Sequence, residues 1–136
     1  MEAAQRFLEA KERHPLGSEY WAQATAAAFT MLTQEECAEV AKPEWWNDEE
    51  LKALSARVLR AAPNNQVANT MRAEVLSGLS GLRGAWEAGP RSAAELREAA
   101  THYDRAAALC YAPAQKAALA GYVTQCHRQA EAMTTM

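Results

Sequence analysis

Adjacent carboxylates can serve as a general acid–base pair, and this chain has two such groups: Glu35 with Glu36, and the run at residues 48–50. Each group falls in the predicted first turn of a helix. The positive end of the helix dipole favours acidic side chains at that place. The dipole explains both groups, so the sequence predicts no catalytic carboxylate.

Cysteine and histidine are the other residue types that could do chemistry. Cys126 and His127 are adjacent, but neighbouring helical residues point about 100° apart and cannot form a nucleophile–base pair. Cys110 and Cys126 fall on apolar stripes, where a free cysteine packs as a small hydrophobe. The chain has no phosphate-binding glycine loop and no hydrolase motif, and no metal-site spacing joins its histidines: His14, His102 and His127. We expect no catalytic residue, no metal and no cofactor.

Length and composition are typical of one soluble globular domain over residues 1–136, with 49% hydrophobic and 23% charged residues. Fourteen basic and seventeen acidic residues give a formal net charge of -3. That balance offers no broad basic surface, so nucleic acid and anionic membranes are not expected partners. No apolar run suits a signal peptide or a membrane span. Three cysteines are too few for a disulfide scaffold, so we expect a reducing, cytoplasmic location.

Helix is the only regular structure that the sequence favours. Alanine is abundant and isoleucine is absent, a balance that suits helices and not strands. Proline and glycine divide the chain into six or seven helices, and Ser92 with Glu95 forms a capping box at the start of one of them. We predict an all-α fold of stacked antiparallel helical hairpins, as a right-handed array or a compact bundle, with breaks near Pro15, Pro43, Pro63, Gly89 and Pro113.

Apolar residues recur at helical spacing along the whole chain. These stripes are expected to form the core: Trp21, Ala24, Ala28 and Leu32; Leu51, Leu54 and Val58; Val67, Met71, Val75, Leu79 and Leu82; Leu96, Ala99, Tyr103, Ala107 and Cys110; and Leu119, Tyr122, Val123, Cys126 and Ala130.

Two helices have special expectations. A short helix is predicted to begin at Thr33, with Glu36 completing a capping box and Cys37 packing on Leu32. The helix after the third proline is predicted to be long, and its second half contains glycines that allow a close helix crossing or a bend: Gly78, Gly81 and Gly84.

Two adjacent tryptophans, Trp45 and Trp46, precede an acidic run. With Asn47 as the N-cap, Trp46 and Leu51 occupy the two positions of a hydrophobic staple, and Glu50 can bond back to the amide of the cap. Trp46 is therefore assigned a structural role. Trp45 points to the other side, either onto the preceding helices or into solvent, where it would face a partner.

The segment ELREAATHYDRAAALCYAPAQKAALAGYVTQCHRQA, residues 95–130, resembles the second helix of one tetratricopeptide repeat followed by the first helix of the next. It has the small–aromatic–small–aliphatic–proline order of that family at Ala99 or Ala100, Tyr103, Ala106 or Ala107, Leu109 and Pro113. Residues 55–79 are similar, with matching positions at Leu59, Pro63, Ala68 and Ala73. The two prolines are 50 residues apart, whereas the family period is about 34. MIT-type three-helix domains, which bind partner helices, carry a similar alanine–tyrosine–alanine helix.

The resemblance implies a non-enzymatic interaction module. In tetratricopeptide-like proteins the first helix of each hairpin lines a groove for a peptide or protein partner, and amides and cations there hold backbone or carboxylate groups. In this chain the helices after Pro63 and from Pro113 would line the groove. Asn69, Arg72 and Lys116 would then share one exposed face. The candidate partner-binding residues are Asn65, Asn69, Arg72 and Lys116 with Gln115, together with Trp45 if its ring is exposed.

Two further questions stay open at this point. The chain has room for only two or three hairpins, so it binds one partner or pairs with itself as a homodimer. A rival class is a small-molecule binder or enzyme with a pocket between helices, whose walls would include Trp21, Trp45, Tyr20 or His102. A deep apolar cavity with convergent polar groups would favour this rival, and a shallow elongated groove would favour the interaction module.

Overall fold

The structure is a computed structural model that describes residues 2–33, 42–78, 86 and 88–134. Within these ranges the chain forms six helices and no strand, which confirms the all-α prediction, and the helices break near the predicted prolines and Gly89. The helix expected to begin at Thr33, with Glu36 and Cys37, falls on residues 34–41 and so lies outside the described ranges. The helices are α1 (Glu2–Arg13), α2 (Glu19–Leu32), α3 (Asp48–Ala61), α4 (Gln66–Ser77), α5 (Ala93–Leu109) and α6 (Pro113–Thr134).

Side-chain caps fix where the middle four helices begin. The capping oxygen of each accepts a backbone N–H about one turn ahead, which satisfies a donor that the helix cannot pair itself. The predicted capping box of α5 is complete. Asn47 caps α3 as predicted. Its backbone N–H, however, donates to the Trp45 carbonyl oxygen at 3.0 Å, whereas a bond to the Glu50 side chain was expected. The four caps are Ser18 for α2, Asn47 for α3, Asn65 for α4 and Ser92 for α5.

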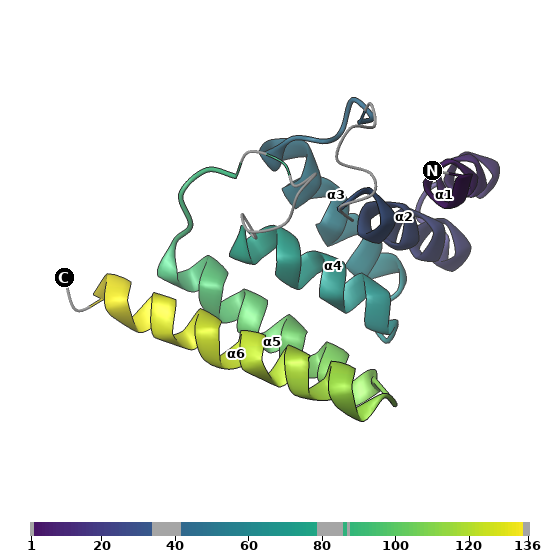
Figure 1. Ribbon diagram of the computed structural model, residues 1–136. Coiled ribbons are helices and arrows are strands. Elements are labelled where there is room, and N and C mark those ends of the chain that lie inside the picture. The colour runs from purple at the N-terminus through teal and green to yellow at the C-terminus, as the bar shows by residue number, and fades with distance from the viewer. Residues whose placement is uncertain (1, 34–41, 79–85, 87, 135–136) are drawn as a thin grey trace.

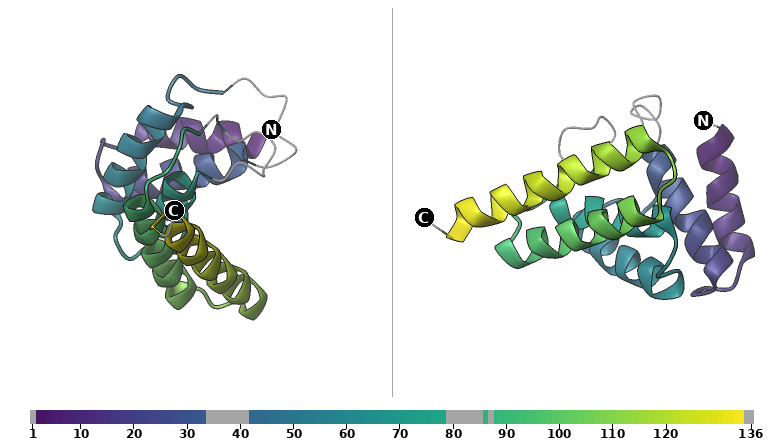
Figure 2. Two further views of the ribbon diagram at one scale, coloured as in Figure 1. Left: turned by 90° about the vertical axis from the view of Figure 1, so that its left-hand side faces the viewer. Right: turned by 90° about the horizontal axis from the view of Figure 1, so that it is seen from below.

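The helices pack mainly against their neighbours in sequence. Helix α1 packs on α2, α2 on α3 and α4, and α3 on α4. Figure 1 shows α5 and α6 side by side as an antiparallel hairpin at one end of the molecule, with α1 at the other end. The views in Figure 2 show the same order. Both α4 and α6 make their largest contacts with α5.

Helix α4 contributes to both halves of the hydrophobic core. Met71 and Val75 belong to a cluster with α2, α3 and Trp86. Ala73 and Leu76, on the other side of the same helix, belong to a cluster with α5 and α6. The predicted stripes account for five of the eleven buried residues of the first cluster and six of the ten of the second, and Tyr122, expected inside, is 40% exposed.

Gly78 ends α4 earlier than the sequence suggested. Its backbone is left-handed, with φ of 65°, and its N–H donates to the Glu74 and Val75 carbonyl oxygens. Glycine adopts this conformation without the steric cost that a side chain brings. A Cβ at this position would also lie 3.0 Å from Nε of Arg91. The expected long helix therefore stops at Ser77, and Gly81 and Gly84 lie outside the described residues.

The tryptophan pair packs into the core around α2. The Trp46 ring lies 5.4 Å from Phe29 and 6.1 Å from Trp86, measured between ring centroids. Trp45 lies 5.8 Å from Trp46, and the ammonium of Lys11 on α1 lies 5.9 Å from its ring. Both indoles are partly buried. Of the two orientations left open for Trp45, the structure has the one onto the preceding helices.

Replacing Trp46 by alanine is expected to lower the free energy of unfolding by about 2 kcal/mol, because the change removes aromatic contacts from the core. Trp45→Ala is expected to cost about half as much, since that ring has fewer core partners. Urea denaturation of both variants measures the difference. Equal and negligible losses would show that the pair is a surface patch.

Candidate functional site

The two asparagines predicted to face a partner support the turn before α4. The Asn65 side chain is the N-cap of that helix and accepts the Ala68 N–H at 2.9 Å. Asn69 is fully buried, and its Nδ2 donates to the Pro63 and Asn65 carbonyl oxygens at 3.0 and 2.9 Å. The expectation that Asn69 lies on an exposed face is therefore wrong, because its amide satisfies backbone acceptors inside the fold.

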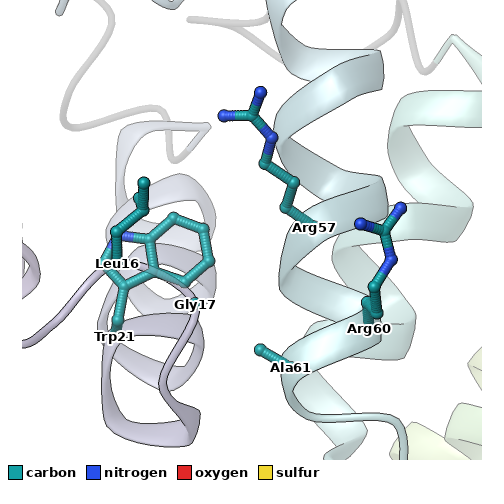
Figure 3. Close-up of a pocket in the computed structure, with 6 residues that line it drawn as sticks. All are labelled: Leu16, Gly17, Trp21, Arg57, Arg60 and Ala61. Carbon is teal, nitrogen blue, oxygen red and sulfur yellow. The ribbon is translucent and has the colours of Figure 1, made fainter.

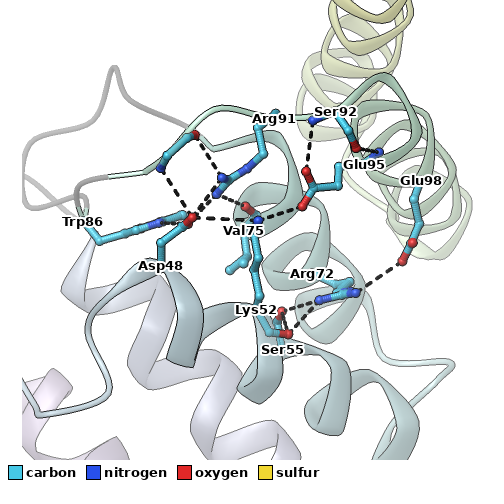
Figure 4. Close-up of polar contacts among 11 residues, drawn as sticks. Asp48, Lys52, Ser55, Arg72, Val75, Trp86, Arg91, Ser92, Glu95 and Glu98 are labelled. Carbon is cyan, nitrogen blue, oxygen red and sulfur yellow. Dashed lines mark hydrogen bonds and ion pairs between the residues drawn. The ribbon is translucent and has the colours of Figure 1, made fainter.

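Arg72 also points into the fold. Its Nη1 donates to the Lys52 carbonyl oxygen at 2.8 Å and to Ser55 Oγ at 3.0 Å, and its Nη2 lies 3.5 Å from the Glu98 carboxylate (Figure 4). The guanidinium thus joins α3, α4 and α5, and its side chain is only 15% exposed. Lys116 is exposed near the start of α6. The expected shared exposed face of Asn69, Arg72 and Lys116 does not form.

Asp48 accepts four hydrogen bonds that tie α3 to the segment before α5 (Figure 4). Trp86 Nε1 donates to its carboxylate at 2.8 Å and the Gly89 N–H at 3.3 Å, while both terminal nitrogens of Arg91 donate to it, Nη1 at 3.0 Å. The hydrogen bond from Arg91 is the main reason why the pKa of Asp48 falls to about 2. The sequence explained Asp48 by the helix dipole alone, because nothing local indicates a partner about forty residues away.

The same polar cluster continues onto α5. Lys52 Nζ lies 2.7 Å from the Glu95 carboxylate, and this hydrogen bond lowers the pKa of Glu95. Arg91 Nη2 also donates to the Val75 carbonyl oxygen at 2.9 Å. We call Asp48, Lys52, Trp86, Arg91 and Glu95 the polar clasp. Its charged groups bond one another, so we assign it to holding helices together and not to a ligand.

The residues proposed for the walls of a single interhelical pocket do not converge. Trp21 lines a cavity of about 300 Å³ with α3, and Trp45 lines a different one of about 280 Å³ with α1. His102 lies on α5, where its Nε2 is 3.2 Å from the Glu98 carboxylate. In the part of the chain that the structure describes, this geometry favours surface grooves over one deep pocket.

The cavity beside Trp21 is the best candidate site (Figure 3). It lies between the start of α2 and the end of α3, and we call it the α2–α3 groove. Arg57, Arg60 and Ala61 have the i, i+3 and i+4 spacing that places them on one face of α3. A second cavity of about 200 Å³ shares Ala61 and extends toward the turn before α4. The groove is lined by Leu16, Gly17, Trp21, Arg57, Arg60 and Ala61.

Exposed Leu16 and two unpaired cations line this groove, and exposed Tyr20 directly precedes Trp21. Leu16 is 73% exposed and Tyr20, on the first turn of α2, is 68% exposed. Within the described residues the guanidinium groups of Arg57 and Arg60 take part in no ion pair or hydrogen bond, unlike those of Arg72 and Arg91. Sequence reasoning missed this site because two arginines one turn apart are typical of any solvated helix face.

The fold and the groove together define a six-helix protein, over the residues described, with a shallow site on its surface. Comparison of the chain with protein-family models, curated proteins and solved structures finds no match. None of the helices in the described ranges is long and apolar enough to cross a membrane.

Proposed function

We propose that this protein is a non-enzymatic interaction module that binds a peptide or protein segment in the α2–α3 groove. The observation that carries the proposal is the placement of two unpaired arginines and exposed Leu16 on one cavity, with exposed Tyr20 directly before the lining residue Trp21 in the sequence. Arginine and large aromatic side chains supply much of the binding energy at protein interfaces. An exposed aliphatic and aromatic pair beside them gives a partner apolar surface to cover.

The dimensions of the groove support a peptide over a small molecule. A volume of about 300 Å³ is at the lower end of the range for small-molecule pockets, about 300–1,000 Å³. The adjoining cavity past Ala61 lengthens the site along α3. A site of this shape accommodates single side chains of an extended segment in succession.

The function is the one expected from the tetratricopeptide-like resemblance, but the binding site lies elsewhere in the fold. Stacked helices present the groove, but α2 and α3 line it instead of α4 and α6. The buried free thiols of Cys110 and Cys126 support the reducing, cytoplasmic location that we propose for the protein.

Selection of random displayed peptides on the immobilised full chain tests the function. We expect enriched peptides, and we expect the double change Leu16→Ser with Tyr20→Ser to weaken their binding by about tenfold or more, because it removes the apolar contacts. Both side chains are exposed, so the melting temperature should stay close to that of the unchanged protein. Fluorescence anisotropy with a synthetic copy of the strongest ligand measures the affinity.

Tyr111→Ser with Met133→Ser is the matched control, since these apolar side chains are 100% and 45% exposed and line neither the α2–α3 groove nor the adjoining cavity. The control pair should bind the peptide as the unchanged protein does. Absence of any enriched peptide, or equal weakening by both pairs of changes, would contradict the proposal.

A further inference from the structure

The chemistry of the α2–α3 groove indicates which segments it selects. We infer that the groove binds a peptide segment in which an aspartate or glutamate side chain stands next to a bulky apolar one; this inference rests on the proposed function. Arg57 and Arg60 receive the carboxylate, and the surface formed by Leu16, Trp21 and Ala61 receives the apolar side chain.

The charge of the groove selects an anion. Both arginines are exposed and line the groove, and Figure 3 shows them on successive turns of α3, with the Arg57 guanidinium extending toward α2. Within the described residues neither is neutralised by a carboxylate of the chain itself. A planar guanidinium holds a carboxylate through two parallel hydrogen bonds, which gives both charge and directional selectivity.

The groove also has a polarity along its length. Arg57 lies one turn before Ala61, whereas Glu19 lines the adjoining cavity on the other side of Ala61. Glu19 is exposed, and its carboxylate accepts a hydrogen bond from Gln23 at 3.4 Å. A second acid on the ligand near Glu19 would be repelled. The acidic side chain of the ligand is therefore directed to the end of the groove at Arg57.

The apolar part of the site combines a buried side chain, Trp21, with an exposed one, Leu16. Trp21 is only 2% exposed, so its edge forms a fixed floor within the core of the protein. Leu16 follows Pro15 in the turn before α2 and stands at the rim, 73% exposed. A bulky apolar side chain between them would cover part of Leu16 and the methyl of Ala61, and that burial supplies a favourable hydrophobic contribution.

An internal acidic side chain fits this site better than a terminal carboxylate. The groove continues past Ala61 into the second cavity, toward the turn at Pro63 and Asn64. A peptide can therefore run through the site in both directions from the anchored acid. A pocket for a chain terminus would instead be closed beyond the carboxylate group.

The experiment compares ligands selected on two baits, the unchanged chain and the Arg57→Ala, Arg60→Ala variant. Peptides enriched on the unchanged chain should carry an aspartate or glutamate within about three positions of a bulky apolar residue, the reach of adjacent side chains in an extended segment. The variant should lose this acidic preference. Both arginines are exposed and unpaired within the described residues, so the variant should melt as the unchanged chain does.

Synthetic peptides then identify the interacting atoms. Replacing the acid of the best ligand by its amide, and replacing both arginines by alanine, should each raise the Kd by about tenfold or more. Combined, the two changes should weaken binding little more than either alone, because they remove the same interaction. The Arg57→Glu, Arg60→Glu variant should prefer the peptide in which lysine replaces the acid. Arg97→Ala with Arg128→Ala, exposed on α5 and α6, removes the same charge elsewhere and should leave the Kd unchanged.

The outcomes separate the two proposals. Equal affinity of the acidic and amide peptides, or binding only by peptides whose acid is the free carboxyl terminus, would overturn the inference. The proposed function would still hold if the Leu16→Ser, Tyr20→Ser variant lost binding. Equal weakening by the two arginine pairs would mean that the net charge of the protein attracts the peptide, and would also overturn the inference.

Discussion

Replacing Asp48 by asparagine is expected to lower the free energy of unfolding by about 3 kcal/mol at neutral pH. Asparagine retains the shape of the side chain but removes the charge that Arg91 pairs with. The Arg91 side chain is only 7% exposed, so its guanidinium would stay in the fold without an anionic partner. Urea denaturation at neutral pH measures the loss.

Glu49→Gln is the matched control for Asp48→Asn, because Glu49 lies in the same first turn of α3 and is exposed. It should cost about 0.5 kcal/mol, the ordinary interaction of an acid with a helix dipole. Similar losses for the two variants would show that the polar clasp adds nothing beyond this dipole effect.

The carboxylate of Asp48 should also make the free energy of unfolding depend on pH in acid. The pKa of Asp48 is lowered from 3.8 to about 2, so the folded protein holds fewer protons than the unfolded chain between these values. Its contribution to stability is present above about pH 4 and is lost as the pH falls through about 2. The loss amounts to about 2 kcal/mol, and the Asp48→Asn variant should lack this part of the acid dependence. Identical acid curves for the two proteins would contradict this assignment.

Replacing Glu74 by glutamine is expected to stabilise the protein by about 3 kcal/mol near pH 8. Glu74 lies on α4, and burial raises its pKa from 4.5 to about 7. Because its pKa is raised in the folded state, its favourable contribution is full below about pH 4.5 and is lost as the pH rises through about 7. Glutamine has nearly the same shape and carries no charge, so the free energy of unfolding of the variant does not fall as the pH rises through about 7.

Thermal denaturation across pH 5 to 8 tests the Glu74 prediction. The unchanged protein should lose stability through this range, and the Glu74→Gln variant should lose less. Asp104→Asn, an exposed change on α5, is the control and should follow the unchanged protein. A constant difference between Glu74→Gln and the unchanged protein at all pH values would show that packing, and not the charge, causes the effect.

Local sequence patterns predicted the helices well because their causes are local. A cap such as Asn47 or Ser92 acts within one turn, and the spacing of apolar residues determines which face of a helix is buried. Where a polar residue points depends on the neighbouring helix. The tetratricopeptide-like resemblance places Arg72 on an exposed groove face, yet Lys52 and Ser55 of α3 offer it acceptors inside the fold.

The sequence did not predict the α2–α3 groove, because the groove too depends on which helices become neighbours. Arg57 and Arg60 carry no local feature that separates them from other surface arginines. Their significance comes from lining one cavity with Leu16 and Trp21, about forty residues earlier in the chain. The resemblance likewise places Asn69 on an exposed face, whereas its amide supports the turn at Pro63.

Helix α4 packs into two core clusters at once, and this determines which helices can open separately. In the described residues α6 makes its main contacts with α5, so it can separate from the fold while the cluster around Met71 stays closed. Helix α4 cannot separate in this way, since its two sides hold the two clusters together. Backbone amides of α6 should therefore exchange with deuterium through a small local opening, and those of α4 only when the whole chain unfolds.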